Sequence, residues 1–139
     1  MSQDNKVSVY PLKEIDLEGG NILHGLKKSD NGYINFGEVY FSMLNFNAIK
    51  AWKFHQSMTL NLVVPIGKVL FVFFLPIDNT FKEVIIGEEN YQRINVPPGI
   101  WFGFKGLHES ASLIMNIADI EHDPDEVLRK PINEFKYNW

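Results

Sequence analysis

The sequence predicts an all-β domain built as an antiparallel sandwich or barrel. Runs rich in aromatic and β-branched residues recur from position 33 to position 118. Turn residues separate these runs at intervals of about 8 to 12 positions. The eleven phenylalanines favour a β-rich core. The chain of 139 residues fits one domain, residues 1–139, around one core.

The strands are expected to follow a turn-rich N-terminal third. Asn31-Gly32 has the composition of a tight hairpin turn. The run at 68–75 is apolar on both faces, so we expect it to be buried on both sides. The eight expected strands cover residues 33–44, 48–55, 60–64, 68–75, 81–86, 92–96, 100–104 and 110–118.

One segment carries the signals of a helix start. Asp123 offers an N-cap acceptor, Pro124 fits the first helical position and Glu126 fits the third. We therefore expect a short helical turn near the C-terminus. The last residues, NEFKYNW, end in an aromatic side chain, so this tail is expected to dock on the domain.

Composition excludes several kinds of partner and site. The formal net charge is −4 and no run of Lys or Arg occurs, so neither nucleic acid nor a membrane surface is expected as a partner. The chain has no cysteine, which removes disulfides and thiolate chemistry. No signal-peptide core is present, and the apolar run at 69–76 is too short to span a bilayer. We expect a soluble, cytoplasmic protein.

Polar side chains interrupt the segment AIKAWKFHQSMTLNLVVPIGKVLFVFF at 48–74. Because strand side chains alternate between faces, Lys53 and His55 share one face and Trp52 takes the other. If the register continues through the next loop, Asn61 joins the polar face. A polar face inside a small barrel would form a ligand pocket, whereas on an open sheet it would face solvent.

Several motifs resemble a known family. The stretch VPPGIWFGFKGL at 96–107 resembles a cupin, and the segments GNILHGLKKSD, GEVYFS, HDPDEV and FKYNW, together with 48–74, resemble the dTDP-4-dehydrorhamnose 3,5-epimerase family. The resemblance implies a cupin-type double-stranded β-helix, that is, a jelly-roll barrel. It also implies a homodimer that acts without metal on nucleotide-activated 4-keto-6-deoxy sugars, in making deoxysugars for surface polysaccharide.

The resemblance assigns roles residue by residue. Lys50 stands where the family has a phosphate-contacting arginine, Lys53 where it has its histidine base, and His55 where it has a glutamine. Phe102 replaces the family's second histidine, and Met115 aligns with its tyrosine acid. The base is therefore substituted and the acid is missing from its usual strand.

Epimerisation beside a ketone requires a base, an acid and stabilisation of the enolate. His55 and Lys53 are the predicted catalytic residues, because histidine titrates near neutral pH and a desolvated lysine can lose its proton. A single base could also shuttle one proton in a keto-sugar isomerisation, a reaction of related cupins. Tyr40 lies elsewhere in the sequence, with no placement relative to His55.

Further residues are expected to bind substrate together with Lys50. Trp101 can stack on a sugar or a base, although core packing is the commoner fate of such a residue. Arg93 is a candidate diphosphate ligand, with a plain surface role as the alternative. The polar candidates for contacts with a ligand, or for buried hydrogen bonds, are Glu38, Asn61 and Asn116.

Neither a metal nor another cofactor is expected. Metal cupins carry a His-x-His pair and a later histidine, whereas here Lys53 and Phe102 leave His55 alone. Three functions stay open: an epimerase or isomerase of a nucleotide sugar, an inactive cupin that binds a sugar nucleotide or serves as a pathway partner, and a structural dimer whose pocket is filled by its own aromatic residues.

Overall fold

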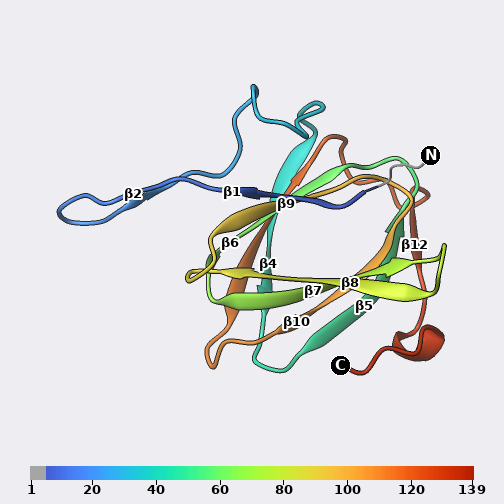
Figure 1. Cartoon of the computed structure of the whole chain (residues 1–139). Coiled ribbons are helices and arrows are strands. Elements are labelled where there is room, and N and C mark those ends of the chain that lie inside the picture. Colours follow the sequence, from blue (N-terminus) through green and yellow to red (C-terminus); the bar gives the residue numbers. More distant parts are fainter. Residues whose placement is uncertain (1–5) are drawn as a thin grey trace.

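The computed structural model describes residues 6–139 as two five-stranded antiparallel sheets that face each other (Figure 1). The first sheet contains, in spatial order, β1 (Ser8–Pro11), β9 (Gln92–Val96), β6 (Leu60–Ile66), β11 (Ser112–Ala118) and β4 (Glu38–Leu44). The second contains β12 (Val127–Arg129), β5 (Ile49–His55), β10 (Trp101–Gly106), β7 (Lys68–Leu75) and β8 (Thr80–Gly87). The all-β prediction is confirmed.

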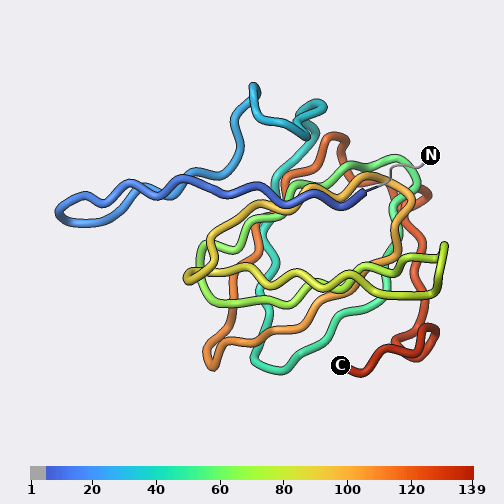
Figure 2. Tube along the Cα trace, in the orientation of Figure 1, coloured from blue at the N-terminus to red at the C-terminus, as the bar shows by residue number. Residues whose placement is uncertain are grey.

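All eight expected strands form, and their bounds shift by at most two residues except at the start of the first. That strand begins at Glu38 rather than at position 33, because the preceding residues run in a loop. Asn31-Gly32 lies in a turn of this loop and does not join two strands, so the hairpin prediction is wrong. A different hairpin, β2 (Glu14–Ile15) with β3 (Ile22–Leu23), projects from the barrel (Figure 2).

The space between the sheets is filled with large apolar side chains. Phe71, Phe73 and Phe102 are 0–2% exposed and belong to one buried cluster with Leu62 and Ile94. Burial of each such side chain contributes about 1.5–3 kcal/mol. Val72, on the other face of β7, is also fully buried. The expected burial of β7 on both faces is confirmed.

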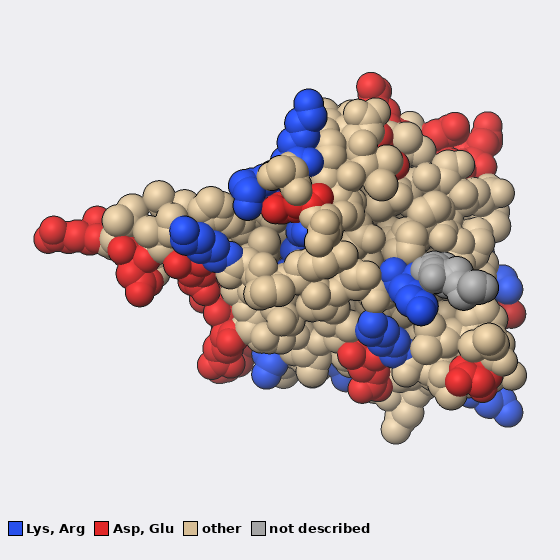
Figure 3. Space-filling model, turned by 45° about the horizontal axis from the view of Figure 1, so that its top comes forward, with Lys and Arg blue, Asp and Glu red and all other residues tan. Residues whose placement is uncertain are grey.

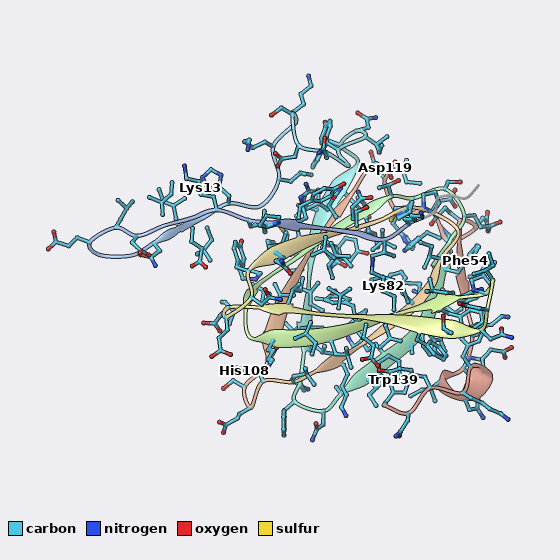
Figure 4. The ribbon with its side chains drawn as sticks, in the orientation of Figure 1. Lys13, Phe54, Lys82, His108, Asp119 and Trp139 are labelled. Atoms are coloured by element: carbon cyan, nitrogen blue, oxygen red, sulfur yellow. The ribbon has the colours of Figure 1, made fainter. Side chains whose placement is uncertain are left out.

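One side of the barrel is closed by the packing of β8 against the first sheet. Strand β8 contacts β6 and β9. Lys82 of β8 reaches across toward β1, where its Nζ donates a 2.8 Å hydrogen bond to the carbonyl of Val7 (Figure 4). At the opposite ends of the two sheets, β4 and β12 are edge strands that do not pair with each other.

The segment that begins at Asp123 is a turn and not a helix. The amide of Glu126 donates to the carbonyl of Asp123, after which the chain enters β12 and pairs with β5. Strand pairing satisfies the backbone groups that a helix would otherwise use. A lone 3-10 turn follows at Ile132–Glu134. Within residues 6–139, no helix is long and apolar enough to cross a membrane.

The aromatic C-terminal tail covers the outer face of β5. The rings of Phe135 and Trp139 lie 5.2 and 5.3 Å from the ring of Trp52, which is 1% exposed. Trp52 Nε1 donates to the carbonyl of Ile132 at 3.0 Å. Trp139 lies against the barrel (Figure 4). The predicted docking is confirmed. Because the tail covers the face of β5 that carries Trp52, the other face, with Lys53 and His55, points into the barrel.

Candidate active site

A cavity of about 310 Å³ opens between the edge strands β4 and β12. Glu38 and Tyr40 line it from β4, Lys53 and His55 from β5, and Arg129 from β12. Arg129 is the cross-strand neighbour of Lys53, so the two side chains share a face. The cavity exists because no further strand bridges the two sheets here. The expected placement of Lys53 and His55 on an inner, pocket-lining face agrees with this geometry.

A second cavity of about 350 Å³ adjoins the first through Lys53 and Arg129, which line both. Its other lining residues include Lys50, Ser42 and Phe104. Four cationic side chains, Lys50, Lys53, Arg129 and Lys130, therefore surround the paired cavities, whereas Glu38 is the one carboxylate among their described lining residues. A site of this charge attracts an anionic ligand.

His55 forms a buried pair with Glu126, which is 71 positions away in the sequence. The ring Nδ1 lies 2.8 Å from Glu126 Oε1, and both residues are 7% exposed. An ionised carboxylate can only accept hydrogen bonds, so Nδ1 carries the proton. His55 Nε2 is then an unprotonated acceptor, and it has no hydrogen-bond partner among the described residues.

The surroundings of Glu126 keep its carboxylate ionised. Its Oε2 accepts hydrogen bonds from the amides of Ser57 at 2.9 Å and Met58 at 2.8 Å. Burial opposes ionisation, but the hydrogen bonds from His55 and from these two amides outweigh it and hold the pKa of Glu126 below its ordinary value. Sequence reasoning gave Glu126 a capping position and missed its contact with His55, although HDPDEV was among the family-like segments.

Burial lowers the pKa of His55 below its ordinary value, and the positive charges of Lys53 and Arg129 act in the same direction. Hydrogen bonding and attraction to Glu126 oppose the shift but do not reverse it. His55 is therefore neutral near pH 7, with a free Nε2, which is the state that a general base requires.

Tyr40 is a candidate proton donor on the strand that faces β5. Its pKa is raised by burial and then by the charge of Glu38, so its hydroxyl keeps its proton at neutral pH. Tyr40 and His55 line the same cavity from opposite sheets. Met115, which aligns with the family's tyrosine acid, is the cross-strand partner of Phe41. Because paired residues share a face and neighbours in a strand alternate, Met115 lies on the face opposite to Tyr40.

Asn61 and Arg93, two of the predicted site residues, line neither of the two cavities. Leu60 and Leu62 enter the buried core, so Asn61 points to the other face of β6. There Asn61 Oδ1 accepts a hydrogen bond from Arg93, whose Nη2 also donates to the carbonyl of Asn31 at 2.8 Å. Asn61 does not share the face of Lys53 and His55, because strand alternation does not continue through the loop after β5. Arg93 fastens a loop to the sheet.

Asn116 and Trp101 also take structural places. Asn116, the cross-strand partner of Tyr40, donates from Nδ2 to Ser42 Oγ at 3.0 Å and to the carbonyl of Tyr40 at 3.3 Å, so it links β11 to β4. The ring of Trp101 lies 5.0 Å from that of Phe54, on the outer side of the second sheet. Neither residue lines the two cavities.

The cavities offer no ready metal site. In the part of the chain that the structure describes, no group of three His, Cys, Asp or Glu side chains is placed to hold a metal ion. Phe102, which stands at the family's second histidine, lines the second cavity, and its ring lies 6.4 Å from that of His55.

Comparison with known proteins places the chain in a family, although no family model matches it. A dTDP sugar isomerase from Desulfovibrio desulfuricans G20 is 31% identical and superposes with a TM-score of 0.90, over 96% of this chain and 90% of that one. The chain belongs to the RmlC-like cupin family of sugar isomerases and epimerases. The family resemblance and the cupin-type jelly roll are both confirmed.

Two other relatives of this RmlC-like cupin differ in what they establish. The probable low-salt glycan biosynthesis epimerase Agl13 of Haloferax volcanii is 31% identical over 97 residues, which are 63% of this chain. The match spans 62% of that protein's length. The sugar 3,4-ketoisomerase QdtA of Thermoanaerobacterium thermosaccharolyticum, solved with TDP, is 18% identical with a TM-score of 0.76 over 94% of both chains. The QdtA likeness shows the fold alone.

Proposed function

We propose that this RmlC-like cupin is a metal-independent epimerase or isomerase of a nucleotide-activated 4-keto-6-deoxy sugar in deoxysugar or polysaccharide biosynthesis. The observation that carries the proposal is the His55–Glu126 pair, which leaves an unprotonated ring nitrogen on a residue that lines the cavity. The two 31% identical relatives, a dTDP sugar isomerase and a probable glycan biosynthesis epimerase, support the same reaction class.

The proposed chemistry starts with a proton transfer. Nε2 of His55 removes the proton from the carbon next to the ketone, and the resulting imidazolium is stabilised by Glu126. Positive charge from Arg129 lies beside the same cavity and favours the electron-rich intermediate. The Tyr40 hydroxyl, on the opposite sheet, returns a proton to the other face of that carbon. All proton transfers are assigned to side chains, without a metal.

The nucleotide diphosphate is assigned to the second cavity. Arg129 lies at the junction of the two cavities, and Lys50 lies farther along the second one. A diphosphate held between these cations would leave the sugar in the cavity next to His55. Phe104 offers an apolar surface to the nucleoside.

We further propose that the working protein is a homodimer in the cytoplasm. The outer face of β4 exposes Val39, Phe41 and Met43 by 41–59%. The projecting hairpin, which carries acidic side chains along its length (Figure 3), also exposes Ile22 and Leu23. A two-stranded hairpin is marginally stable by itself, and a second copy would cover both surfaces. The cytoplasm fits a charged nucleotide sugar, which does not cross a bilayer unaided. Sedimentation velocity checks the dimer, and a monomer throughout the micromolar range contradicts it.

Hydrogen exchange tests the reaction. The protein is incubated with dTDP-4-keto-6-deoxyglucose in deuterated water, with EDTA present, and the sugar protons are followed by NMR. We expect deuterium at C3 or C5, and a loss of about 10²–10⁴-fold in exchange rate in His55→Asn. His24→Gln serves as the matched control, because His24 lies outside the two cavities and should retain full exchange.

The replacement of the family's histidine base by Lys53 favours a second candidate function, a cupin that binds the sugar nucleotide without turnover. Binding of the ligand by calorimetry with no exchange would select this candidate. An absence of both binding and exchange would contradict both functions for this sugar nucleotide.

A further inference from the structure

The ammonium group of Lys53 has no counter-charge among the described residues. It lies on the inner face of β5, two positions before His55, and borders both cavities. No hydrogen bond or ion pair of its side chain occurs within residues 6–139. Glu126, whose negative charge acts on Lys53, is already engaged by His55 and two backbone amides.

The surroundings of Lys53 favour its uncharged amine. Burial is the main cause that lowers its pKa, and the charges of Arg129 and Lys50 act in the same direction, with Glu126 opposing them weakly. A lysine that is desolvated or placed next to another cation becomes a nucleophile toward carbonyl carbons. A phosphate-binding role would instead require a charged ammonium group, and Lys50 and Arg129 offer positive charge for that role in the second cavity.

We propose that Lys53 forms a covalent imine with the ketone carbon of the bound sugar, so that proton removal by His55 proceeds through an enamine. This inference rests on the proposed function, because it requires a keto sugar in the cavity. It gives the substituted position 53 a catalytic role of its own, on the same strand face as the base.

The step balances without any oxidant or reductant. Nζ of Lys53 adds to C4, the carbonyl oxygen takes up protons and leaves as water, and the C4–O bond is replaced by a protonated C4=N bond. His55 Nε2 then removes the proton from C3 or C5, and the C–H electron pair forms a carbon–carbon double bond while the nitrogen becomes neutral. Reprotonation of that carbon and addition of water to C4 release the epimerised ketone and the free amine.

The imine also selects between the two reaction types of the proposed function. Movement of the ketone from C4 to C3 through the same enamine would leave the Lys53 nitrogen bonded to C4 by a stable single bond. Turnover by that route would stop after one event. A mechanism through Lys53 therefore assigns epimerisation of a carbon next to C4, and not 3,4-ketoisomerisation.

Reductive trapping tests the inference. The protein is mixed with dTDP-4-keto-6-deoxyglucose and sodium cyanoborohydride at neutral pH, which reduces an iminium to a secondary amine and spares ketones. Intact mass and peptide mapping should show one adduct per chain, on Lys53. His55→Asn should still form the adduct, because imine formation precedes its proton transfer. Lys53→Arg should form none, whereas Lys68→Arg, a change of a lysine that lines neither of the two cavities, should keep it.

Deuterium exchange, run in parallel, separates the two proposals. We expect Lys53→Arg to lower the exchange rate by about 100-fold or more. Exchange by the unmodified protein without any trapped adduct would overturn the imine and leave the proposed function intact. An adduct on Lys50, or full exchange in Lys53→Arg, would also overturn it. A protein with neither exchange nor adduct would overturn both.

Discussion

The buried His55–Glu126 pair makes a sharp prediction for the substitution Glu126→Gln, which keeps the shape of the side chain and removes its charge. One carboxylate oxygen of Glu126 accepts from the amides of Ser57 and Met58, and the other accepts from His55 Nδ1. A glutamine oxygen can replace the first of these. Its NH₂ group then faces the histidine, so Nδ1 must become the acceptor and Nε2 must carry the proton.

The size of the effect follows from these contacts. A hydrogen bond to a charged group contributes about 1.5–3 kcal/mol and a neutral one about 0.5–1.5 kcal/mol. The two hydrogen bonds from the amides of Ser57 and Met58 are retained but become weaker, so the free energy of unfolding should fall by about 2 kcal/mol in total. Because protonated Nε2 cannot accept the sugar proton, exchange should fall by about 10²–10⁴-fold, as for removal of a general base. Catalysis is lost far beyond what the small stability change explains.

Three measurements check this prediction. Deuterium exchange gives activity, urea unfolding gives stability, and ¹⁵N NMR of the histidine ring reports which nitrogen is protonated. Glu88→Gln is the matched control, because Glu88 also accepts a backbone hydrogen bond, from the amide of Gly67 at 2.7 Å, but lies outside both cavities. This variant should keep full exchange and the same His55 tautomer.

One result would refute the reasoning about Glu126. A Glu126→Gln protein that is folded, exchanges at the unmodified rate and still shows the proton on Nδ1 would mean that the carboxylate does not set the state of His55. Loss of activity with an unchanged tautomer would point to a packing effect and would equally contradict the mechanism.

The other predictions concern the cavity and its pH response. Tyr40→Phe should slow exchange by about 10²-fold or more with the fold unchanged, and equal rates would remove Tyr40 as the proton donor. Arg129→Gln should weaken dTDP binding in calorimetry, and an unchanged affinity would contradict the diphosphate assignment. Because burial lowers the folded-state pKa of His55, the unfolded chain binds a proton first on acidification. The contribution of His55 to the free energy of unfolding should therefore be fully present above about pH 6.5 and decrease below it. The difference between the urea midpoints at about pH 7.5 and about pH 5.5 should be smaller in His55→Asn than in the unmodified protein. An equal difference in the two proteins would contradict the lowered pKa of His55.

Strand β5 shows which side-chain placements the alternation of a strand predicts. Alternation along 49–55 depends only on backbone geometry, so the placement of Lys53 and His55 on one face and Trp52 on the other was predictable. The same argument failed for Asn61, because the intervening loop is not a strand and carries no fixed alternation. Alternation was not applied to Arg93, and its burial beside Asn61 could not be predicted from the sequence because it depends on the pairing of β6 with β9.

The sequence by itself determined the β-rich fold, the eight main strands and the division of β5 into two faces, because each depends on neighbours close in the chain. Only the tertiary structure decided which residues complete the site. Glu126 reaches His55 because the turn at Asp123 leads into β12, and Tyr40 faces them because β4 ends the opposite sheet. These contacts join residues up to 71 positions apart, and long-range strand pairing, rather than local preference, brings them together.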